Sequence, residues 1–481
     1  MPSELVPLFT PMFDSRNADA SPSDERPLLF IDNADLPTAA QKLAVRLGDC
    51  GDMFCVDGHL VRVVVTPDGV AIEPQNIHSI VNAAHEVCRP AVVREINGAP
   101  VVELKTLPAR VATLLLHMRA KWGAPPLKGI CAGVLLSADG EIRCAAGYDP
   151  GTRYWCVGVE SPAVPEFPTY DQAAAALLTL RDTFRTFSFA DRPFVGAGQA
   201  DVIDTSRPPG RDESSYLAAV LTTVARPSLP LAPGALIRAP KFSGAGVGKG
   251  RLVRAPAAIA FGGVPQPFTA GADQAELDKR LASALFTPKP MVWLDNANSE
   301  TLNSHLLAQV LSEEACGGRP LGTSKLTTLT DNAMIVVTGN RVYLSEDLTR
   351  RFLVVELDPR CENPENRRFS GDFVAMIMQR RGGLLAAALT IWRWGRQQKI
   401  DQGVPIGSFE QWASWVRDPL LALGCQDPIA RHAEMKSDDP QRLNLVEFFS
   451  QWRRRYGDQA VTANAIDAEL AKIAGLAACR T

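Results

Sequence analysis

A glycine-rich turn between an apolar segment and a helical pattern constrains the fold of this chain more than any other feature. Residues 235–251 read A-L-I-R-A-P-K-F-S-G-A-G-V-G-K-G-R. A triphosphate needs many backbone N–H donors around its oxygens, and a glycine-rich turn before a helix lets the backbone come that close. We therefore predict a phosphate site, with a lysine to add charge at the β- and γ-phosphates. Its predicted residues are Gly244, Gly246, Val247, Gly248, Lys249 and Gly250.

The turn departs from the usual phosphate-binding pattern, G-x-x-x-x-G-K-[ST], at two positions. Ser243 stands where the first glycine belongs, and Gly250 stands where a magnesium-binding hydroxyl belongs. Water can replace that hydroxyl, because Mg²⁺ normally keeps several waters. Taken alone, the turn also fits an ordinary flexible loop.

A second apolar segment ends in a carboxylate. Residues 290–296 read P-M-V-W-L-D-N, so a strand would deliver Asp295 at its C-terminal end. A carboxylate there is predicted to hold magnesium, directly or through water. The alternative is that Asp295 and Asn296 cap a helix over residues 300–311.

A third apolar segment, 332–337, leads into Thr338-Gly339-Asn340. The amide of Asn340 is suited to orient an attacking water and to sense a γ-phosphate. Further on, Arg350 and Arg351 precede a fourth apolar strand, and an arginine at such a rim is suited to reach the nucleotide of a neighbouring subunit. The alternative for this pair is a surface ion pair with Glu346 or Asp347.

The chain as a whole suggests an α/β core between accessory regions. We expect a disordered tail over 1–27 and an α+β domain over 28–157. A proline-containing linker with one helix covers 158–211, and the α/β nucleotide-binding core covers 212–370. Residues 371–481 are expected to form a helical domain, for which a winged helix is one form.

Charge and cysteine usage narrow the functional classes. The formal net charge is −3 over 481 residues, so no global basic field indicates nucleic acid or an anionic membrane, and any such contact must be local. Ten cysteines are scattered without a C-x-x-C pair, which favours reduced thiols. We find no basic-then-apolar leader and no apolar stretch of about 20 residues, and we expect a cytoplasmic protein without a membrane partner.

The ordered set of motifs resembles the AAA+ core of superfamily 3 helicases. More narrowly, it is similar to the replicative helicases of phages, plasmids and integrated elements known as primase-helicase proteins. The resemblance covers residues 213–370 and is carried by the segments 244–250, 292–296, 319–323, 336–340 and 348–352. It implies a homo-oligomeric, hexameric ring in a bacterial or phage-infected cell. Such a ring hydrolyses ATP with Mg²⁺ at its subunit interfaces and moves along single-stranded or forked DNA.

Carried over by position, the resemblance assigns phosphate binding to Lys249 and magnesium support to Asp295. Asn340 becomes the polar sensor, and Arg350 or Arg351 the finger offered to the next subunit.

One departure concerns the general base. The carboxylate pair expected after the second strand is Asp295-Asn296, and an amide cannot accept the proton of the attacking water. Glu300 and Glu313 are the candidates to replace the missing base. Otherwise hydrolysis is slow, and the chain is an ATP-binding replication scaffold or initiator instead of a motor. A small-molecule kinase is disfavoured, because Asn340 and the arginine pair make sense mainly between subunits.

DNA contact is expected at a predicted hairpin over residues 317–325. In a ring this loop would face the channel, and Arg319 and Lys325 would follow DNA phosphates in a sequence-independent, salt-sensitive way. A solvated hairpin with incidental charge is the alternative. The N-terminal domain lacks the paired carboxylates of a primase and the ligands of a zinc site, so we expect it to serve DNA binding, assembly or recruitment.

Overall fold

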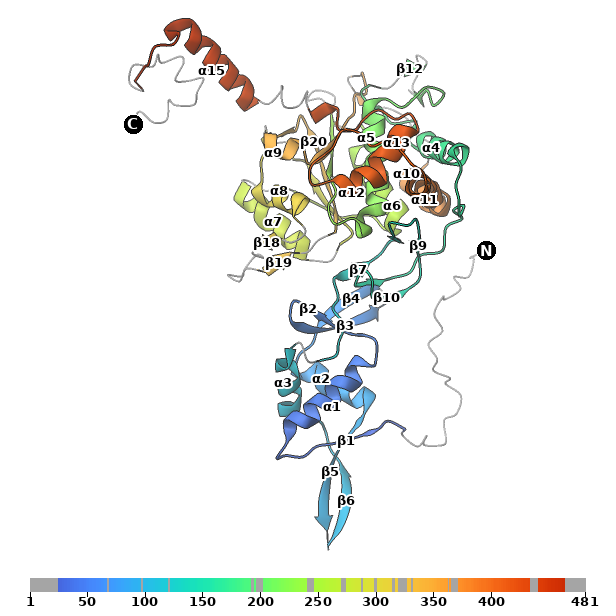
Figure 1. The fold of residues 1–481 in the computed structure, drawn as a ribbon, viewed down its shortest axis with the longest axis vertical. Coiled ribbons are helices and arrows are strands. Elements are labelled where there is room, and N and C mark those ends of the chain that lie inside the picture. The colour runs from blue at the N-terminus through green and yellow to red at the C-terminus, as the bar shows by residue number, and fades with distance from the viewer. Residues whose placement is uncertain are drawn as a thin grey trace. The chain divides into compact units, whose positions relative to one another are not determined.

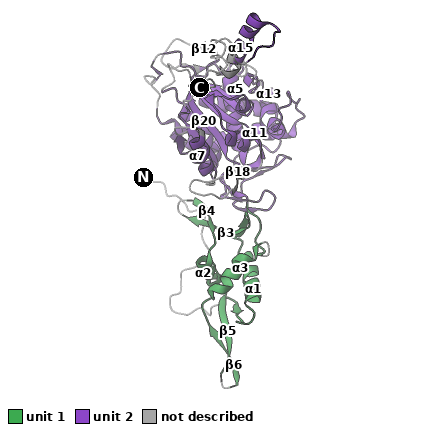
Figure 2. Ribbon diagram, turned by 90° about the vertical axis from the view of Figure 1, so that its left-hand side faces the viewer, with its two compact units in different colours: residues 1–127 green, residues 128–481 purple. Residues whose placement is uncertain are grey.

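The computed structural model divides the chain into two compact units, residues 1–127 and 128–481 (Figure 2). Residues 128–157, which we expected in the N-terminal domain, belong to the second unit. The structure describes residues 25–66, 69–96, 98–119, 122–191, 194–195, 202–239, 246–269, 274–286, 289–297, 301–313, 316–318, 327–329, 332–361, 363–364, 371–432 and 440–462.

Three helices form the core of the first unit. They are α1 (Leu36–Gly48), α2 (Ile77–Val87) and α3 (Ala109–His117). The starts of α1 and α2 have a local cause: Asp35 accepts a hydrogen bond from the N–H of Thr38, and Asn76 forms a reciprocal capping box with Ser79. Buried leucine, alanine and isoleucine side chains from all three helices then meet in one cluster.

Two three-stranded sheets accompany these helices. One joins β1 (Leu28–Phe30), β5 (Arg89–Ile96) and β6 (Ala99–Leu104), in that order. The other joins β2 (Met53–Val56), β3 (His59–Thr66) and β4 (Gly69–Pro74). The described part of the first unit therefore combines helices and strands.

The second unit is built on a five-stranded parallel sheet. Its order is β15 (Pro267–Thr269), β16 (Met291–Asp295), β20 (Met334–Asn340), β14 (Gly234–Ala239) and β22 (Phe352–Glu356). The three central strands are almost continuously buried, as expected for a parallel sheet covered on both faces.

Alternation along the strands separates two hydrophobic layers. Ile237 and Trp293 face a large cluster, whereas Leu236 and Leu294 face a smaller one. The larger layer holds α4 (Tyr170–Phe184), α5 (Arg211–Ala225), α6 (Lys249–Phe261), α10 (Phe373–Gln379) and α11 (Arg381–Gln397). The smaller layer holds α7 (Gln274–Phe286), α8 (His305–Ser312) and α9 (Glu346–Thr349) (Figure 1).

The C-terminal helices share the larger core instead of forming a core of their own. After α11 come α12 (Glu410–Trp412), a π-helical turn (Ala413–Arg417) and α13 (Asp418–Ala422), and the indole N–H of Trp412 donates to the hydroxyl of Thr222 on α5 at 2.8 Å. Farther on lies α15 (Pro440–Tyr456). No strand occurs in 371–432 or 440–462, so these described parts contain no winged helix.

Short elements complete the second unit. One three-stranded sheet has the order β10 (Gly147–Asp149), β11 (Tyr154–Cys156) and β7 (Gly129–Cys131). The two-stranded sheets are β8 (Leu135–Leu136) with β9 (Ile142–Arg143), β12 (Phe194–Val195) with β13 (Val202–Ile203), β17 (Thr301–Leu302) with β21 (Tyr343–Leu344), and β18 (Cys316–Gly318) with β19 (Thr327–Leu329). A 3-10 turn covers Arg226–Ser228.

The order of the parallel strands creates a switch point. The connection from β14 leads to β15 at one edge, whereas the connection from β20 passes β14 to reach β22 at the other edge. Where neighbouring strands send their connections in opposite directions, the carboxyl ends leave a crevice that ligands occupy. In this sheet that place is the carboxyl edge of β14 and β20.

Among the described residues, no single helix has both the length and the apolar character needed to cross a membrane, and one bent pair, α10 with α11 at 72°, meets those criteria only when taken together.

Candidate functional site

The glycine-rich turn follows the carboxyl end of β14, an inner strand of the sheet. Residues 240–245, including Gly244, lie outside the described residues, and the description resumes at Gly246. Gly246 has φ +70° and Gly248 has φ +94°, a region that L side chains rarely adopt. A Cβ on Gly248 would also come within 2.9 Å of the ring of Phe187. The conformation and the space both require glycine at 248, where α6 begins.

Lys249, the first residue of α6, directs its ammonium across the carboxyl edge of the sheet. Its Nζ donates to Oδ1 of Asn340, at the end of β20, at 2.7 Å. Burial lowers the pKa of Lys249, and the nearby carboxylate of Asp295 partly opposes that effect. The ends of β14, β16 and β20 thus bring together the lysine, the carboxylate and the amide that the sequence singled out.

Asp295 is held in place by neighbouring donors. Its Oδ1 accepts from the hydroxyl of Thr338 and from the N–H of Asn296, the latter at 2.9 Å. The Thr338 hydroxyl in turn accepts from the indole N–H of Trp293 at 2.9 Å. The other oxygen, Oδ2, receives the Asn296 side chain at a long 3.4 Å. That oxygen keeps lone pairs for a magnesium ion or a water on it, so the carboxylate fits the expected metal.

The helix-cap alternative for Asp295 and Asn296 is wrong. Helix α8 begins at His305, and its N-cap is Ser304, whose side chain accepts from the N–H of Leu307. Asn296 instead has φ +55° and turns the chain away from the sheet at an exposed position. Asparagine adopts this left-handed conformation more readily than most residues, which accounts for an amide at this place.

Close packing around Gly250, the residue after the lysine, leaves little space for a side chain there. A Cβ on Gly250 would lie 3.2 Å from the ring of Trp293 and 3.0 Å from the guanidinium of Arg254. That guanidinium stacks over the Trp293 ring at 4.8 Å from the ring centre. The site is therefore built around Trp293, without room for a hydroxyl-bearing side chain at 250 unless the ring moves.

Arg350 and Arg351 differ in exposure. Both pair with Asp347, so the ion-pair interpretation describes each of them. The Arg351 side chain is only 10% exposed and also donates to the carbonyl of Asp347, whereas the Arg350 side chain is 63% exposed and its ion pair is long, at 3.4 Å. Arg350 is therefore the arginine that is accessible to a neighbouring molecule.

The predicted DNA-binding loop falls in a hairpin whose tip is outside the described residues. Strands β18 and β19 pair antiparallel, with Gly318 opposite Thr327. Arg319 and Lys325 lie between them and outside the described part, as does Glu300. Glu313 is exposed and follows the last residue of α8, where its N–H bonds back to that helix.

A buried ionic cluster braces the same edge of the sheet. Asp212, at the start of α5, is fully buried and pairs with Arg431 at 2.7 Å, and its Oδ1 accepts from the N–H of Glu356 at 2.8 Å. Arg431 and Arg238 both reach the Glu356 carboxylate, at 3.0 and 3.3 Å. Burial raises the pKa of Asp212 to about 7, although Arg431 opposes it.

Sequence reasoning missed this cluster and the support around Asp295. Arg431 and Asp212 are 219 positions apart, a separation at which no local pattern operates. For Thr338 a signal existed, because it is a hydroxyl residue within an otherwise apolar strand and shares the strand face of Asn340.

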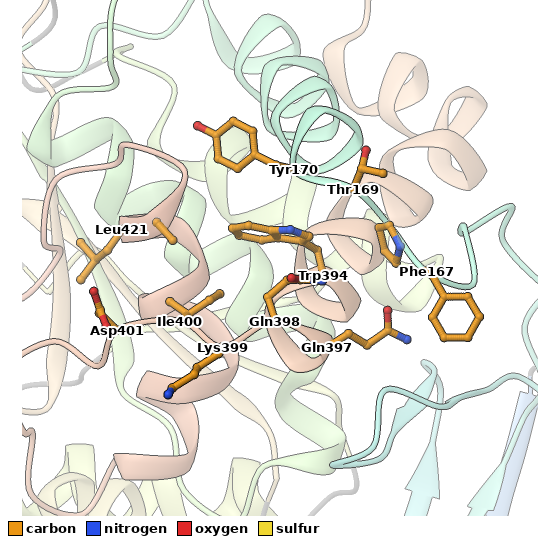
Figure 3. Close-up of a pocket in the computed structure, with 12 residues that line it drawn as sticks. Phe167, Thr169, Tyr170, Trp394, Gln397, Gln398, Lys399, Ile400, Asp401 and Leu421 are labelled. Carbon is orange, nitrogen blue, oxygen red and sulfur yellow. The ribbon is translucent and has the colours of Figure 1, made fainter.

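A separate pocket of about 790 Å³ opens elsewhere in the second unit (Figure 3). Tyr170, at the start of α4, meets Trp394 of α11 edge to face, with ring centres 5.8 Å apart. Lys399 and Asp401 add charge to its wall. None of the described residues singled out from the sequence lines this pocket.

The fold and the site define a mixed α/β protein that gathers a lysine, a carboxylate and an amide at the switch point of a parallel sheet. No protein-family model matches the sequence, and no curated protein matches it. Among solved structures, the apo A form of the NrS-1 C-terminal region is 12% identical, with 90% of this chain and 85% of that chain covered and a TM-score of 0.37.

A second structure of that region, residues 305–718, is 14% identical, with coverage of 91% and 86% and a TM-score of 0.38. JCV helicase bound to a thiazolopyridine compound is 14% identical, with coverage of 50% and 64% and a TM-score of 0.23. All three TM-scores are below 0.5, so the structural similarity is low.

Proposed function

We propose that this chain is an ATP-dependent DNA helicase or translocase of a replicating mobile element, working as a homo-oligomeric ring. The observation that carries the proposal is the meeting of Lys249, Asp295 and Asn340 at the ends of three adjacent parallel strands. A cation, a metal-binding carboxylate and a neutral sensor at one switch point suit the polyphosphate of a nucleotide.

In this proposal the triphosphate lies on the turn before α6. The backbone around Gly246 to Gly248 donates to its oxygens, and Lys249 exchanges its bond to Asn340 for the β- and γ-phosphates. Asp295 would hold Mg²⁺, with water in the place of the missing hydroxyl at 250, and the ion would supply screening of the phosphate charge. Asn340, once released from the lysine, would orient the attacking water.

Arg350 is our candidate for the arginine offered to the next subunit. Its exposure and its single long ion pair leave it able to exchange Asp347 for a phosphate, which offers stronger, bidentate hydrogen bonding. The ring contact would be head-to-tail, a heterologous interface that closes when the rotation permits. Arg319 and Lys325 would then follow DNA inside the channel.

A second candidate function is an ATP-binding scaffold that hydrolyses slowly. Two observations favour it: Asn296 stands where a general base is expected, and a Cβ at position 250 would lie only 3.2 Å from the ring of Trp293. In that case ATP would close the ring and DNA would be held without rapid turnover.

Steady-state ATPase activity with and without single-stranded DNA separates the two functions. A motor shows turnover that DNA stimulates and that Lys249→Met abolishes. A scaffold binds ATP with the same dependence on Lys249 but turns it over slowly under both conditions. Absence of ATP binding contradicts both.

Mixing variants tests the site between subunits. Arg350→Ala lowers ATPase activity if this arginine acts on the nucleotide of a neighbouring subunit. Lys249→Met lowers it because the subunit loses its own phosphate-binding lysine. Mixed in one ring, an Arg350→Ala subunit keeps its lysine and receives the arginine of a Lys249→Met neighbour, so activity returns in part. Arg207→Ala is the matched control, because Arg207 is 68% exposed and also pairs with an aspartate three positions away.

A further inference from the structure

The β5–β6 hairpin extends beyond the helices of the first unit (Figure 1). Only the start of β5 pairs with β1, through Arg89, Pro90 and Ala91. From Val92 onward the hairpin has two strands. A two-stranded ribbon is marginally stable in water and gains stability when further strands join it.

One face of this small sheet is apolar, and its side chains other than the fully buried Ala91 are exposed. Phe30 lies beside Ala91, which lies beside Leu104, so these residues form one row across β1, β5 and β6. Val93 and Val102 form the next row. Phe30, Val93, Val102 and Leu104 are 47%, 56%, 48% and 51% exposed. Contiguous apolar exposure of this kind marks an interaction surface.

The free side of β6 can accept another strand. The N–H of Lys105 donates to the carbonyl of Pro90, so the backbone groups of Lys105 point toward β5. Because these directions alternate along a strand, the N–H and C=O of Val102 and Leu104 point away from β5. Within the described residues β6 pairs with β5 alone, and such an edge is a template for strand addition.

We propose that residues 102–106, the end of β6 and the two residues after it, pair antiparallel with the same segment of a second copy of this chain, about a two-fold axis at Leu104. Leu104 then faces Leu104 of the second copy as a hydrogen-bonded pair, and the row from Phe30 through Ala91 continues across both molecules. The result is a six-stranded sheet with one continuous apolar face.

Charge selects this register. Glu103 pairs with Arg94 and Lys105 of its own chain. The register adds Lys105 of the second copy directly opposite Glu103, twice by symmetry, and opposite charges across strands stabilise a sheet. A two-fold axis at Glu103 would set two glutamates opposite each other, which is destabilising. An axis at Val102 would leave both charged residues opposite uncharged ones.

This contact is isologous, with the same surface on both copies, and so differs from the head-to-tail contact of the proposed ring. It does not depend on nucleotide. Sedimentation equilibrium of the full chain without ATP or magnesium therefore tests it apart from the proposed function. We expect a reversible monomer–dimer equilibrium in the wild type.

A charge swap tests the register. Glu103→Lys places like charges opposite each other and should raise the dimer Kd by about tenfold or more. The double variant Glu103→Lys with Lys105→Glu restores opposite charges and should recover the wild-type Kd. Because Glu103 also pairs with Arg94 and Lys105 of its own chain, urea denaturation of both variants is the control that separates a loss of folding from a loss of dimer.

Leu104→Pro tests the edge itself. It removes the outward N–H of residue 104 and leaves the bonds between β5 and β6 in place, so the folded chain should become monomeric. A wild-type chain that stays monomeric at all concentrations overturns the proposal, because the face then belongs to another partner or to another segment of the same chain. A dimer that none of these substitutions weakens overturns it as well.

Discussion

Lys249 and Asn340 are joined by a 2.7 Å hydrogen bond that links the first residue of α6 to the last residue of β20. The bond satisfies a half-buried ammonium whose pKa burial lowers. In the proposed function a polyphosphate would displace the amide from the lysine. The amide and the phosphate would then compete for one cation, and this competition makes the proposed site testable.

Two substitutions of Asn340 test the competition through their effects on ATP affinity. Asn340→Ala removes the internal partner of the lysine but also the group that contacts ligand, so the ATP affinity should fall about threefold to tenfold. Asn340→Asp provides an anion that pairs with the lysine and repels phosphate, so the affinity should fall further. Isothermal titration measures both. Equal affinities for the aspartate and alanine variants would contradict this account.

Thr338 supports Asp295 and accepts from the indole of Trp293. Thr338→Val keeps the shape but leaves a buried N–H without its acceptor, and should lower the free energy of unfolding by about 1–3 kcal/mol. Thr338→Ser keeps the hydroxyl and should lose much less. Urea denaturation of the two variants provides the comparison, and similar losses for both would mean that the hydroxyl is not the stabilising group.

Adding the missing hydroxyl at residue 250 should not restore an ordinary magnesium ligand. Gly250→Ser pushes against Trp293 and should be destabilising by about 1 kcal/mol or more, despite the better helix propensity of serine. In a Trp293→Phe background the smaller ring gives way, so the same substitution should be better tolerated. A double-mutant cycle measures this coupling, which we expect to be about 1 kcal/mol. A coupling of zero would show that the two positions do not touch.

The buried carboxyl of Asp212 should make stability depend on pH. Its pKa rises from 3.8 to about 7 because burial disfavours the charged form. Below pH 4 its contribution to stability is fully present. Between about pH 4 and 7 the unfolded chain loses the proton that the folded chain keeps, so stability declines by at most about 1.4 kcal/mol per pH unit.

The neutral variant Asp212→Asn lacks this titration and serves as the reference. As pH rises from 5 to 7, the free energy of unfolding of the wild type should therefore fall relative to that of the variant. Urea denaturation at several pH values measures it. A difference that stays constant over that range contradicts the raised pKa.

The positions of the candidate site residues at strand ends and at a helix start could be predicted from the sequence. Gly248 and Lys249 follow an apolar strand and start a helix, and Asp295 and Asn340 end their strands, so a parallel sheet brings them to one edge.

Features made by distant residues were not predictable. The contact between Gly250 and Trp293 depends on how α6 packs on the sheet, and the Asp212–Arg431 pair depends on the path of the whole second unit. The start of α8 was misplaced because Ser304, not Asp295 or Asn296, provides its cap. We predicted a separate domain for the C-terminal helices, because the sequence alone does not show which core their tryptophans fill.

Titration of Mg²⁺–ATP into the full chain tests the central claim most directly, with Lys249→Met as the site variant and Lys279→Met, an exposed lysine on α7, as the matched control. We predict binding by the wild type and the control, and an affinity at least about 30-fold weaker for Lys249→Met, because the variant loses charged hydrogen bonds worth roughly 2–3 kcal/mol. Equal affinities for all three proteins, or no binding by the wild type, would contradict a nucleotide site at this turn.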